Sequence, residues 1–309
     1  MKIAFMFSGQ GAQFPGMMKQ LCEAESAAKA VFDIADAALG RGISALCFEG
    51  AQEELNLTHN TQPCVLAADL AAAAALRAHG VEPEGVAGFS LGEYAALAWA
   101  GSIPMEDVFE LIQYRADSMQ QAVAPGVGAM AAMLGGSAEQ VEAICASVTE
   151  GYVVAANYNC PTQTVISGEA AAVEQAVALA RPQRIRGKLL AVSAPFHCAL
   201  MESAAKKLEA LFATWQFAAP SLPVYMNVDG RVHADASELA DLLVRQAMSP
   251  VRWVQTLQNM RADGFDTFIE CGPGKTLSGL AAKTLEGVTI LRVGDMETLK
   301  ETLEALDRL

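Results

Sequence analysis

The sequence predicts an α/β protein with a parallel sheet and an inserted ferredoxin-like βαββαβ unit. Apolar runs such as Ile3–Phe7 have the length and composition of strands that are buried on both faces of a parallel sheet. The stretch Gly88-Phe89-Ser90-Leu91-Gly92 stands between such a run and a helical pattern. From residue 128 to about 195 the pattern changes to strand, helix, strand, strand, helix and strand, which is the ferredoxin-like order.

The overall composition limits the class of protein. The chain has 309 residues, of which 52% are hydrophobic, and this suggests about two domains with a core that needs no covalent links. The net charge of −14 argues against nucleic acid and against an anionic membrane as general partners. No apolar run reaches the ~18 residues that a membrane span needs.

The seven cysteines are scattered along the chain and include no Cys-x-x-Cys pair. This pattern indicates neither a disulfide framework nor a structural zinc site, and it favours a reducing compartment. The apolar start Met1–Phe7 is too short for a signal peptide. We therefore expect a cytoplasmic protein that uses no metal and no cofactor.

In the N-terminal part, the strand Ile3–Phe7 leads into a glycine-rich stretch at residues 8–13. Glycines let backbone N–H groups come close to a ligand, although the same stretch is also compatible with a plain turn. It is not a phosphate loop, because Gly-x-x-x-x-Gly-Lys-Ser/Thr is absent. Further along, Pro63 is expected to open a helix that Gly80 closes.

The stretch Gly88–Gly92 predicts a nucleophile elbow, a sharp turn from strand to helix. Glycine at the flanking positions lets the turn close, because a side chain there would collide with neighbouring backbone. Ser90 is then held at the start of a helix, where free backbone N–H groups face developing negative charge.

The next helix is predicted from Pro104 to about Gln121. Arg115 follows Val108 by seven residues and Leu111 by four, so it lies on the inward, apolar face. A buried guanidinium is costly unless an anion meets it. Arg115 is therefore either part of an internal ion pair or the receptor for a substrate carboxylate, which its planar fork binds well.

After the break at Pro125-Gly126, six elements form the ferredoxin-like unit. A Ser137-x-x-Gln140 capping box begins its first helix. We predict a large domain of residues 1–125 and 196–309, and a small inserted domain of residues 126–195. The small domain's elements are expected at Ala129–Leu134, Ser137–Ser147, Tyr152–Asn157, Thr164–Ile166, Ala170–Ala180 and Lys188–Val192.

The C-terminal part returns to the large domain. Its elements are expected at Leu222–Val228 (strand), Asp235 to Gln246 (helix), Thr267–Ile269 (strand), Thr289–Val293 (strand) and Glu297 to Leu306 (helix). Of the four histidines, only His197 lies in a setting that suits a catalytic base, after Pro-Phe and before a helix at the domain junction.

These residues suggest acyl transfer. A serine hydroxyl needs an adjacent base at neutral pH, and His197 is the candidate for Ser90. The oxyanion needs two donors, for which we consider the N–H of Leu91 and the N–H of Gln10. No Asp is clearly placed to orient the imidazole of His197, so we expect a backbone carbonyl near Gln246 to do so.

The chain resembles the malonyl-CoA:acyl-carrier-protein transacylases, which belong to the acyltransferase family of fatty acid and polyketide synthesis. The resemblance runs in order over nearly the whole chain. The motifs that carry it are Phe7-Ser8-Gly9-Gln10-Gly11-Ala12-Gln13, Gly88–Tyr94, Tyr114-Arg115, Asn157–Pro161, Phe196–Met201, Val244-Arg245-Gln246, Ser249–Trp253 and Glu270–Gly274.

The resemblance implies a role for each site residue. Ser90 would carry the acyl group, with His197 as base and then acid. Arg115 would bind the malonyl carboxylate, Gln10 and Leu91 would supply the oxyanion N–H groups, and Gln246 would help to orient the histidine. It also implies an α/β hydrolase-like large domain, and ping-pong transfer of malonyl from malonyl-CoA to the phosphopantetheine thiol of holo-acyl carrier protein. We expect a monomer.

The chain departs from the family pattern at one position and carries a selective residue at another. Phe89 replaces the usual His before the serine, which removes a polar group near the substrate. Phe196 stands where related domains sort malonyl from branched acyl groups, and its bulk is compatible with malonyl.

Because the family's carrier is usually acidic, a local basic patch must receive it. The candidates are Arg181, Arg184, Arg186, Lys188, Lys206, Lys207, Lys275 and Lys283.

Three other functions remain open from the sequence. A patatin-type lipid hydrolase would pair Ser90 with Asp229 of an Asp-Gly, but it would leave Arg115 unexplained. A non-catalytic carrier-binding module would require Ser90 and His197 to have lost their catalytic role. An acyltransferase that serves a polyketide synthase would use the same chemistry.

Overall fold

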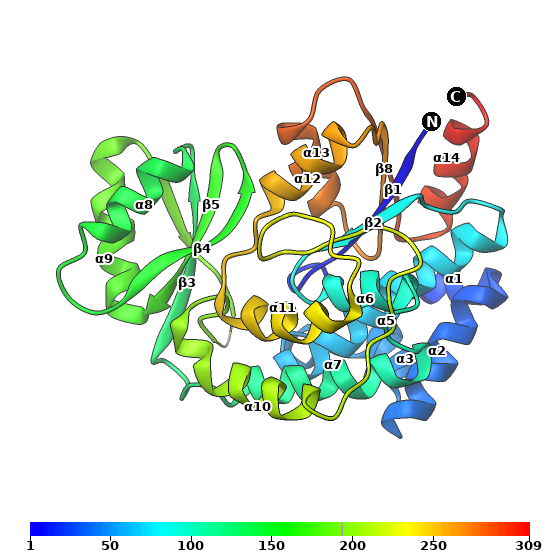
Figure 1. Ribbon diagram of the computed structural model, residues 1–309, viewed down its shortest axis with the longest axis horizontal. Helices are drawn as coiled ribbons and strands as arrows, with labels where there is room; N and C mark the ends of the chain where they lie inside the picture. The colour runs from blue at the N-terminus through cyan, green and yellow to red at the C-terminus, as the bar shows by residue number, and fades with distance from the viewer. Residues whose placement is uncertain (193) are drawn as a thin grey trace.

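The computed structural model describes residues 1–192 and 194–309, and in these residues the strands form two sheets (Figure 1). The larger sheet is parallel and has five strands, and the smaller sheet has four. The smaller sheet and its helices lie at the left of the view, beside the larger unit. The predicted α/β class and parallel sheet are therefore confirmed.

The larger sheet places its central strands so that their carboxyl ends share one edge. Its strands, in spatial order, are β7 (Val224–Tyr225), β2 (Gly85–Gly88), β1 (Ile3–Phe7), β8 (Thr267–Cys271) and β9 (Thr289–Val293), and every pairing is parallel. Phe7, the last residue of β1, lies opposite Gly88 and Cys271. The loops that follow these three strands therefore meet at one edge, where open α/β sheets bind ligands.

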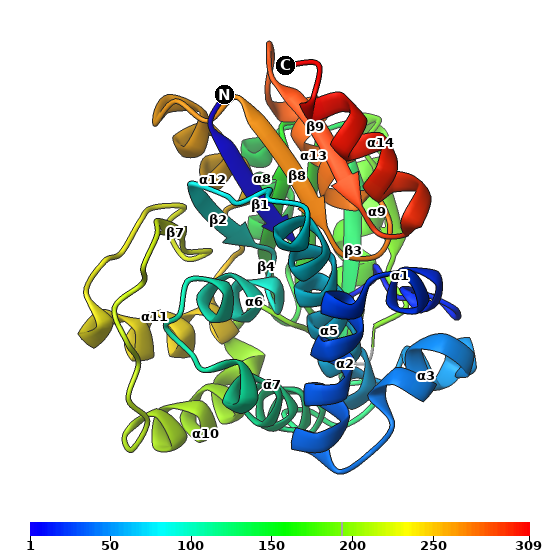
Figure 2. The ribbon, with the colours of Figure 1, turned by 90° about the vertical axis from the view of Figure 1, so that its right-hand side faces the viewer.

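Both faces of the larger sheet are buried. Along β1, Phe5 and Phe7 pack into one core with helices such as α5 (Thr58–Ala78) and α6 (Gly92–Trp99). Met6 points to a second core with α12 (Trp253–Ala262) and α13 (Thr276–Thr284). Figure 2 shows the strands of this sheet side by side, with α14 (Met296–Leu306) along β9. Burial on both sides explains why the strands read as unbroken apolar runs.

The smaller sheet is antiparallel, with the order β4 (Val153–Cys160), β5 (Gln163–Glu169), β3 (Gly128–Leu134) and β6 (Arg186–Leu189). Helices α8 (Ala138–Ala146) and α9 (Ala170–Ala180) pack on one face. The predicted capping box is confirmed, since Ser137 Oγ accepts from Gln140 N (3.3 Å) and Gln140 Oε1 accepts from Ser137 N (2.9 Å). The domain limits 126 and 195 stay a prediction, and Ser193 lies outside the described residues.

The other face of the smaller sheet is turned toward the larger unit. There Met130, Ala132 and Val165 form a core with Phe196 and Met201. The backbones of the two units also pair, because Val251 N donates to the carbonyl of Ala156 and Tyr158 N donates to the carbonyl of Val251, both at 2.9 Å. These contacts fix the strand β4 above the carboxyl edge of the larger sheet.

The remaining elements belong to the layers around the larger sheet, except η1, which follows α9 in the smaller unit. They are α1 (Lys19–Ala24), α2 (Ser26–Leu39), α3 (Ile43–Glu49), α4 (Gln52–Leu55), α7 (Met105–Gln120), η1 (Arg181–Gln183), η2 (Ala199–Met201), α10 (Glu202–Phe212) and α11 (Ala236–Met248). Within the described part of the chain, none of the helices has both the length and the hydropathy to cross a bilayer.

The prediction that Pro63 opens its helix is wrong. Helix α5 begins at Thr58, and Pro63 lies inside it. A proline in a helix lacks an N–H, so the carbonyl four residues earlier loses its usual partner. That carbonyl belongs to His59, and it accepts instead from Arg41 Nη2 (3.0 Å) and Gln113 Nε2 (3.2 Å). Tertiary contacts therefore compensate the helix for its proline.

Several predicted strands also differ in extent. The strand expected over Leu222–Val228 is reduced to Val224–Tyr225, because β7 is the edge strand and its only strand partner in the sheet is β2, at Val86 and Ala87. The strand expected at Lys188–Val192 is found as β6, which begins two residues earlier. The strands expected at Tyr152–Asn157, Thr164–Ile166 and Thr267–Ile269 are longer, at Val153–Cys160, Gln163–Glu169 and Thr267–Cys271. None of these changes alters the order of the elements.

Candidate active site

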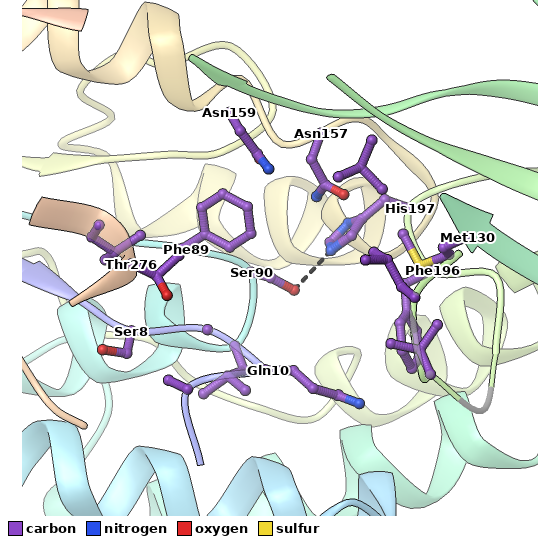
Figure 3. Close-up of a pocket in the computed structure, with 18 of the residues that line it drawn as sticks. Ser8, Gln10, Phe89, Ser90, Met130, Asn157, Asn159, Phe196, His197 and Thr276 are labelled. Carbon is purple, nitrogen blue, oxygen red and sulfur yellow. Dashed lines mark hydrogen bonds between the residues drawn. The ribbon is translucent and has the colours of Figure 1, made fainter. Parts of the chain in front are cut away.

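A cavity of about 220 Å³ lies at the carboxyl edge of the larger sheet, beneath the smaller sheet (Figure 3). It gathers five of the six predicted site residues: Gln10, Ser90, Leu91, Arg115 and His197. These residues come from separate parts of the chain, namely the loops after β1 and β2, helix α7 and the segment before η2. The sixth, Gln246, is 1% exposed and lies behind the cavity wall.

The local sequence around Ser90 forms a tight elbow. Ser90 has a φ of 55°, in the left-handed region that non-glycine residues seldom adopt. A Cβ on Gly88 would lie 1.8 Å from the carbonyl oxygen of Gly92, and a Cβ on Gly92 would lie 2.4 Å from that of Phe7. Both glycines are therefore required, one for the turn itself and one for its contact with β1.

Ser90 and His197 form a hydrogen-bonded pair. The distance between Ser90 Oγ and His197 Nε2 is 2.7 Å, and the two side chains point toward each other in Figure 3. His197 also has a left-handed backbone, with a φ of 60°, and only 3% of its surface is exposed. Two strained residues that face each other are the geometry expected of a nucleophile and its base.

The backbone of Gln246 orients the imidazole. His197 Nδ1 lies 3.0 Å from the carbonyl oxygen of Gln246. A carbonyl can only accept, so the proton of a neutral imidazole is on Nδ1 and the lone pair of Nε2 faces Ser90. The side chain of Gln246 also donates through Nε2 to the carbonyl of Ser90 (2.8 Å), so the residue holds both members of the pair.

Burial and a nearby cation keep the imidazole neutral. Loss of hydration, and then the positive charge of Arg115, lower the pKa of His197 from 6.5 to about 4. At neutral pH the residue is therefore uncharged, which is the state that a general base requires.

Arg115 is held by amides in the wall of the cavity. It is 1% exposed, and its Nη1 donates to Gln62 Oε1 (2.7 Å) while Nη2 donates to Gln246 Oε1 (2.9 Å) and to Ser90 Oγ (3.2 Å). Among the described residues no carboxylate lies within 4.0 Å of its guanidinium. The internal ion pair considered from the sequence is therefore not found. A buried cation with no carboxylate in direct contact, beside the nucleophile, suits a ligand carboxylate.

Gln10 and Leu91 line the same cavity as Ser90. Figure 3 shows Gln10 below the serine, on the loop after β1. Phe89 N donates to the carbonyl of Phe7 (3.0 Å), and this bond ties the elbow to the end of β1. Leu91 is the residue before α6, so its N–H belongs to the unpaired start of that helix. Adjacent strands thus place both proposed oxyanion donors beside the nucleophile.

Aromatic side chains and two amides form the rest of the wall. The ring of Phe89 lies edge-on to Trp253, with the centroids 5.5 Å apart, and Phe196 closes the opposite side (Figure 3). Asn157 and Asn159 reach the cavity from β4, above Ser90. The position of Phe89 is thus part of an apolar surface, which explains how a phenylalanine is accommodated there.

The Asp229 of the alternative lipid-hydrolase mechanism is occupied elsewhere. Its Oδ2 lies 3.0 Å from His233 Nε2, and its Oδ1 accepts from Arg231 N (3.0 Å). Ser90 pairs with His197 instead. The geometry favours a Ser-His pair over a Ser-Asp pair.

Sequence reasoning missed two residues of this site. Gln62 accepts from Arg115, and Asn227 contacts the elbow, with its Oδ1 accepting from Ser90 N at 2.7 Å. Gln62 lies in the long helix α5 and Asn227 just after β7, far from Ser90 in the sequence. Only the folded chain brings them to the serine, and no local motif marks them.

Comparisons with known proteins agree with this geometry. The profile of the family described as "Acyl transferase domain" matches residues 4–301. The chain is 42% identical over 308 residues to the malonyl CoA-acyl carrier protein transacylase of Bacillus subtilis, covering 99% of this chain and 97% of that protein. It is 39% identical over 306 residues to the protein of the same name from Escherichia coli K12, covering 98% and 99%.

Solved structures are equally similar. The acyl-carrier-protein S-malonyltransferase of Burkholderia pseudomallei superposes with a TM-score of 0.95 at 42% identity, covering 98% of this chain and all of that one. A malonyl-transacylase in complex with a type II polyketide synthase acyl carrier protein gives a TM-score of 0.96 at 37% identity, covering 99% and 100%.

Proposed function

Because the chain belongs to the acyl transferase domain family, we propose that the Ser90 cavity performs its chemistry, the transfer of malonyl from coenzyme A to an acyl carrier protein. The chain is an acyltransferase whose relatives along its whole length are malonyl CoA-acyl carrier protein transacylases. The observation that carries the proposal is a Ser-His pair 2.7 Å apart, next to a buried arginine that has no carboxylate partner among the described residues.

In the first half-reaction Ser90 becomes acylated. His197 Nε2 takes the hydroxyl proton while Ser90 Oγ attacks the thioester carbonyl of malonyl-CoA. The N–H groups of Leu91 and Gln10 stabilise the oxyanion. The carbon–sulfur bond then breaks, the proton on His197 passes to the coenzyme A thiolate, and a malonyl ester remains on Ser90.

The second half-reaction runs the same steps with another thiol. The phosphopantetheine thiol of the carrier gives its proton to His197 and attacks the malonyl ester. When the ester bond breaks, His197 returns that proton to Ser90 Oγ. The residue is thus base and then acid in each half-reaction.

Arg115 supplies the selectivity for malonyl. Its guanidinium lies within 3.2 Å of the nucleophile's oxygen, so a carboxylate bound there belongs to the same short acyl group that Ser90 attacks. Acetyl has no such carboxylate. The cost of burying the arginine is therefore offset when malonyl is bound and not when acetyl is bound.

The carrier approaches over a basic surface that we place on the small sheet. Arg181, Arg184, Arg186 and Lys188 lie close together in the sequence around β6 and form no ion pair with any described residue. Of the candidates on the large domain, Lys206 pairs with Glu202 at 2.7 Å, and the described ion pairs include none of Lys207, Lys275 and Lys283. Lys188 lies on β6, and the chain continues from β6 to Leu190 and Val192 in the cavity wall. The carrier of a polyketide synthase is a second candidate, since one similar structure holds such a carrier. A monomer in the cytoplasm remains our expectation.

Brief mixing with malonyl-CoA or acetyl-CoA, followed by intact-protein mass spectrometry, tests the proposal. Wild type should gain one malonyl group and little acetyl, and Ser90→Ala should gain neither. An unmodified wild type, or an acetyl adduct as strong as the malonyl adduct, would contradict the proposed reaction.

A further inference from the structure

We propose that Asn227 is a positioning residue, which holds the backbone of Ser90 in the conformation from which the serine attacks. The inference rests on the proposed function, because it concerns the rate at which Ser90 becomes acylated. Asn227 lies just after β7 and is 1% exposed, so it touches neither solvent nor the cavity.

The side chain of Asn227 bridges the two sides of the elbow. Its Oδ1 accepts from Ser90 N at 2.7 Å, and its Nδ2 donates to the carbonyl oxygen of Gly88 at 2.6 Å. One side chain thus bonds the last residue of β2 and the nucleophile, across Phe89. An amide is the side chain that offers a donor and an acceptor side by side, and a carboxylate or an alkyl group of similar size does not.

The backbone of Asn227 is itself fixed by the helix that follows the elbow. Glu93 Oε2 accepts from Asn227 N at 2.5 Å, and Glu93 lies in the first turn of α6, three residues after Ser90. Glu93 is fully buried, and burial raises its pKa to about 8. The elbow, Glu93 and Asn227 therefore form a closed set of contacts around the turn.

Ser90 is consequently held at both of its backbone polar groups by side-chain amides. Asn227 accepts from its N–H, and Gln246 donates to its carbonyl at 2.8 Å. The φ of 55° is costly for a serine, on the order of 1–3 kcal/mol for such residues in general, and persists only where the surroundings impose it. The contact with Asn227 also removes the N–H of Ser90 from the oxyanion donors, which leaves that role to Leu91 and Gln10.

The variant Asn227→Asp separates this positioning role from general structural support. An ionised aspartate still accepts from Ser90 N but cannot donate to the carbonyl of Gly88, whereas a protonated one can do both. The new carboxyl is buried next to Glu93, and the other charged groups that act on Glu93 are Arg115 and Asp229. Burial raises the pKa of such a carboxyl, so its protonation state changes near neutral pH.

The measurement is the single-turnover rate of Ser90 acylation by malonyl-CoA, by rapid mixing and intact-protein mass spectrometry. At pH about 8, Asn227→Asp should be slower than wild type by about 10²-fold, and it should recover as the pH falls to about 6. Wild type is measured at the same pH values, because Glu93, whose pKa is raised to about 8, also titrates there, and its rate should change far less than that of the variant. The half-saturating concentration of malonyl-CoA should stay the same, since Arg115 and the cavity wall are untouched.

Asn259→Asp is the matched control. Asn259 also donates to a glycine carbonyl, that of Gly230 at 2.8 Å, but it lies on α12, outside the cavity wall. It should acylate like wild type at each pH. If Asn227→Asp fails to fold, Asn227→Ser provides the test, because its shorter side chain cannot span both contacts and should lower the maximal rate alone.

The outcomes distinguish a failure of the proposed function from a failure of the positioning role of Asn227. If wild type is not acylated, the proposed function fails. If wild type is acylated and Asn227→Asp follows the same pH profile as wild type, or loses substrate affinity in place of maximal rate, the positioning role is overturned.

Discussion

His197 Nδ1 lies 3.0 Å from the backbone carbonyl oxygen of Gln246, in the place where many serine enzymes have a carboxylate. A carbonyl fixes the tautomer as well as a carboxylate does, but it brings no full negative charge to stabilise an imidazolium. Burial of the imidazole, and then the positive charge of Arg115, lower the pKa of His197 to about 4, and the contact with the Gln246 carbonyl offsets only part of this shift. The base is thus weak, and it is always available in the range where cells operate.

The first prediction concerns the identity of the base. His197→Ala should slow the acylation of Ser90 by roughly 10²–10⁴-fold, because the hydroxyl loses its proton acceptor at 2.7 Å. The rate is measured by rapid mixing with malonyl-CoA. Asp229→Ala is the control and should acylate normally, since Asp229 contacts His233 and Arg231. The opposite ranking of the two variants would favour the lipid-hydrolase mechanism.

The second prediction follows from the lowered pKa of His197. Its neutral form is the active one, so the acylation rate should be flat from about pH 7 to about pH 5 and should fall as the pH approaches about 4. Replacing Arg115 by Gln removes a charge that lowers this pKa, and the acid limb should then move to higher pH. Acetyl-CoA is the donor for this comparison, because it does not need Arg115. If the acylation rate of wild type already fell near pH 6.5, the imidazole of His197 would not be desolvated as described.

The third prediction concerns malonyl selectivity. Arg115→Ala should lose malonyl transfer and keep or gain acetyl transfer, because only malonyl has a carboxylate for the guanidinium. Arg115→Lys keeps the charge but not the planar fork, and should recover part of the malonyl rate. Both rates are measured with the same enzyme preparation. An equal loss of malonyl and acetyl transfer would mean that Arg115 supports the cavity without selecting the substrate.

The fourth prediction concerns the glycines of the elbow. Gly88→Ala should destabilise the fold by about 1–3 kcal/mol or more, since its Cβ would lie 1.8 Å from the carbonyl oxygen of Gly92. Gly279→Ala is the matched control, because it lies in α13 with no atom within 4 Å of its Cβ and should stabilise by roughly 0.4–1 kcal/mol. Chemical denaturation measures both. Equal stability of the two variants would contradict the elbow geometry.

The fifth prediction concerns the carrier. Reversing the charge at Arg186 and Lys188 should weaken transfer from malonyl-Ser90 to the carrier protein, while acylation by malonyl-CoA stays as in wild type. Lys206→Glu is the control, since that lysine already pairs with Glu202. The two half-reactions are followed separately by mass spectrometry. Loss of both, or an equal effect of Lys206→Glu, would place the docking surface elsewhere.

Much of the fold could be predicted because its signals are local. The unbroken apolar run Ile3–Phe7 predicts that β1 is buried on both faces, and Gly88 and Gly92, on either side of Ser90, predict the elbow. The spacing of Arg115 from Val108 and Leu111 placed it on the buried face of α7, where the structure has it. The prediction that Pro63 opens its helix was wrong because the helix is stabilised by contacts from Arg41 and Gln113, which no local pattern shows.

The sequence by itself determined the order of the elements and the positions of the proposed site residues on them, because turns, caps and periodic burial depend on near neighbours. Only the tertiary structure decided their distances. The bond between Ser90 and His197 joins positions 107 residues apart, and the bond between Ser90 and Asn227 joins positions 137 apart. Such contacts depend on how the strands and helices pack, and packing is a property of the whole chain.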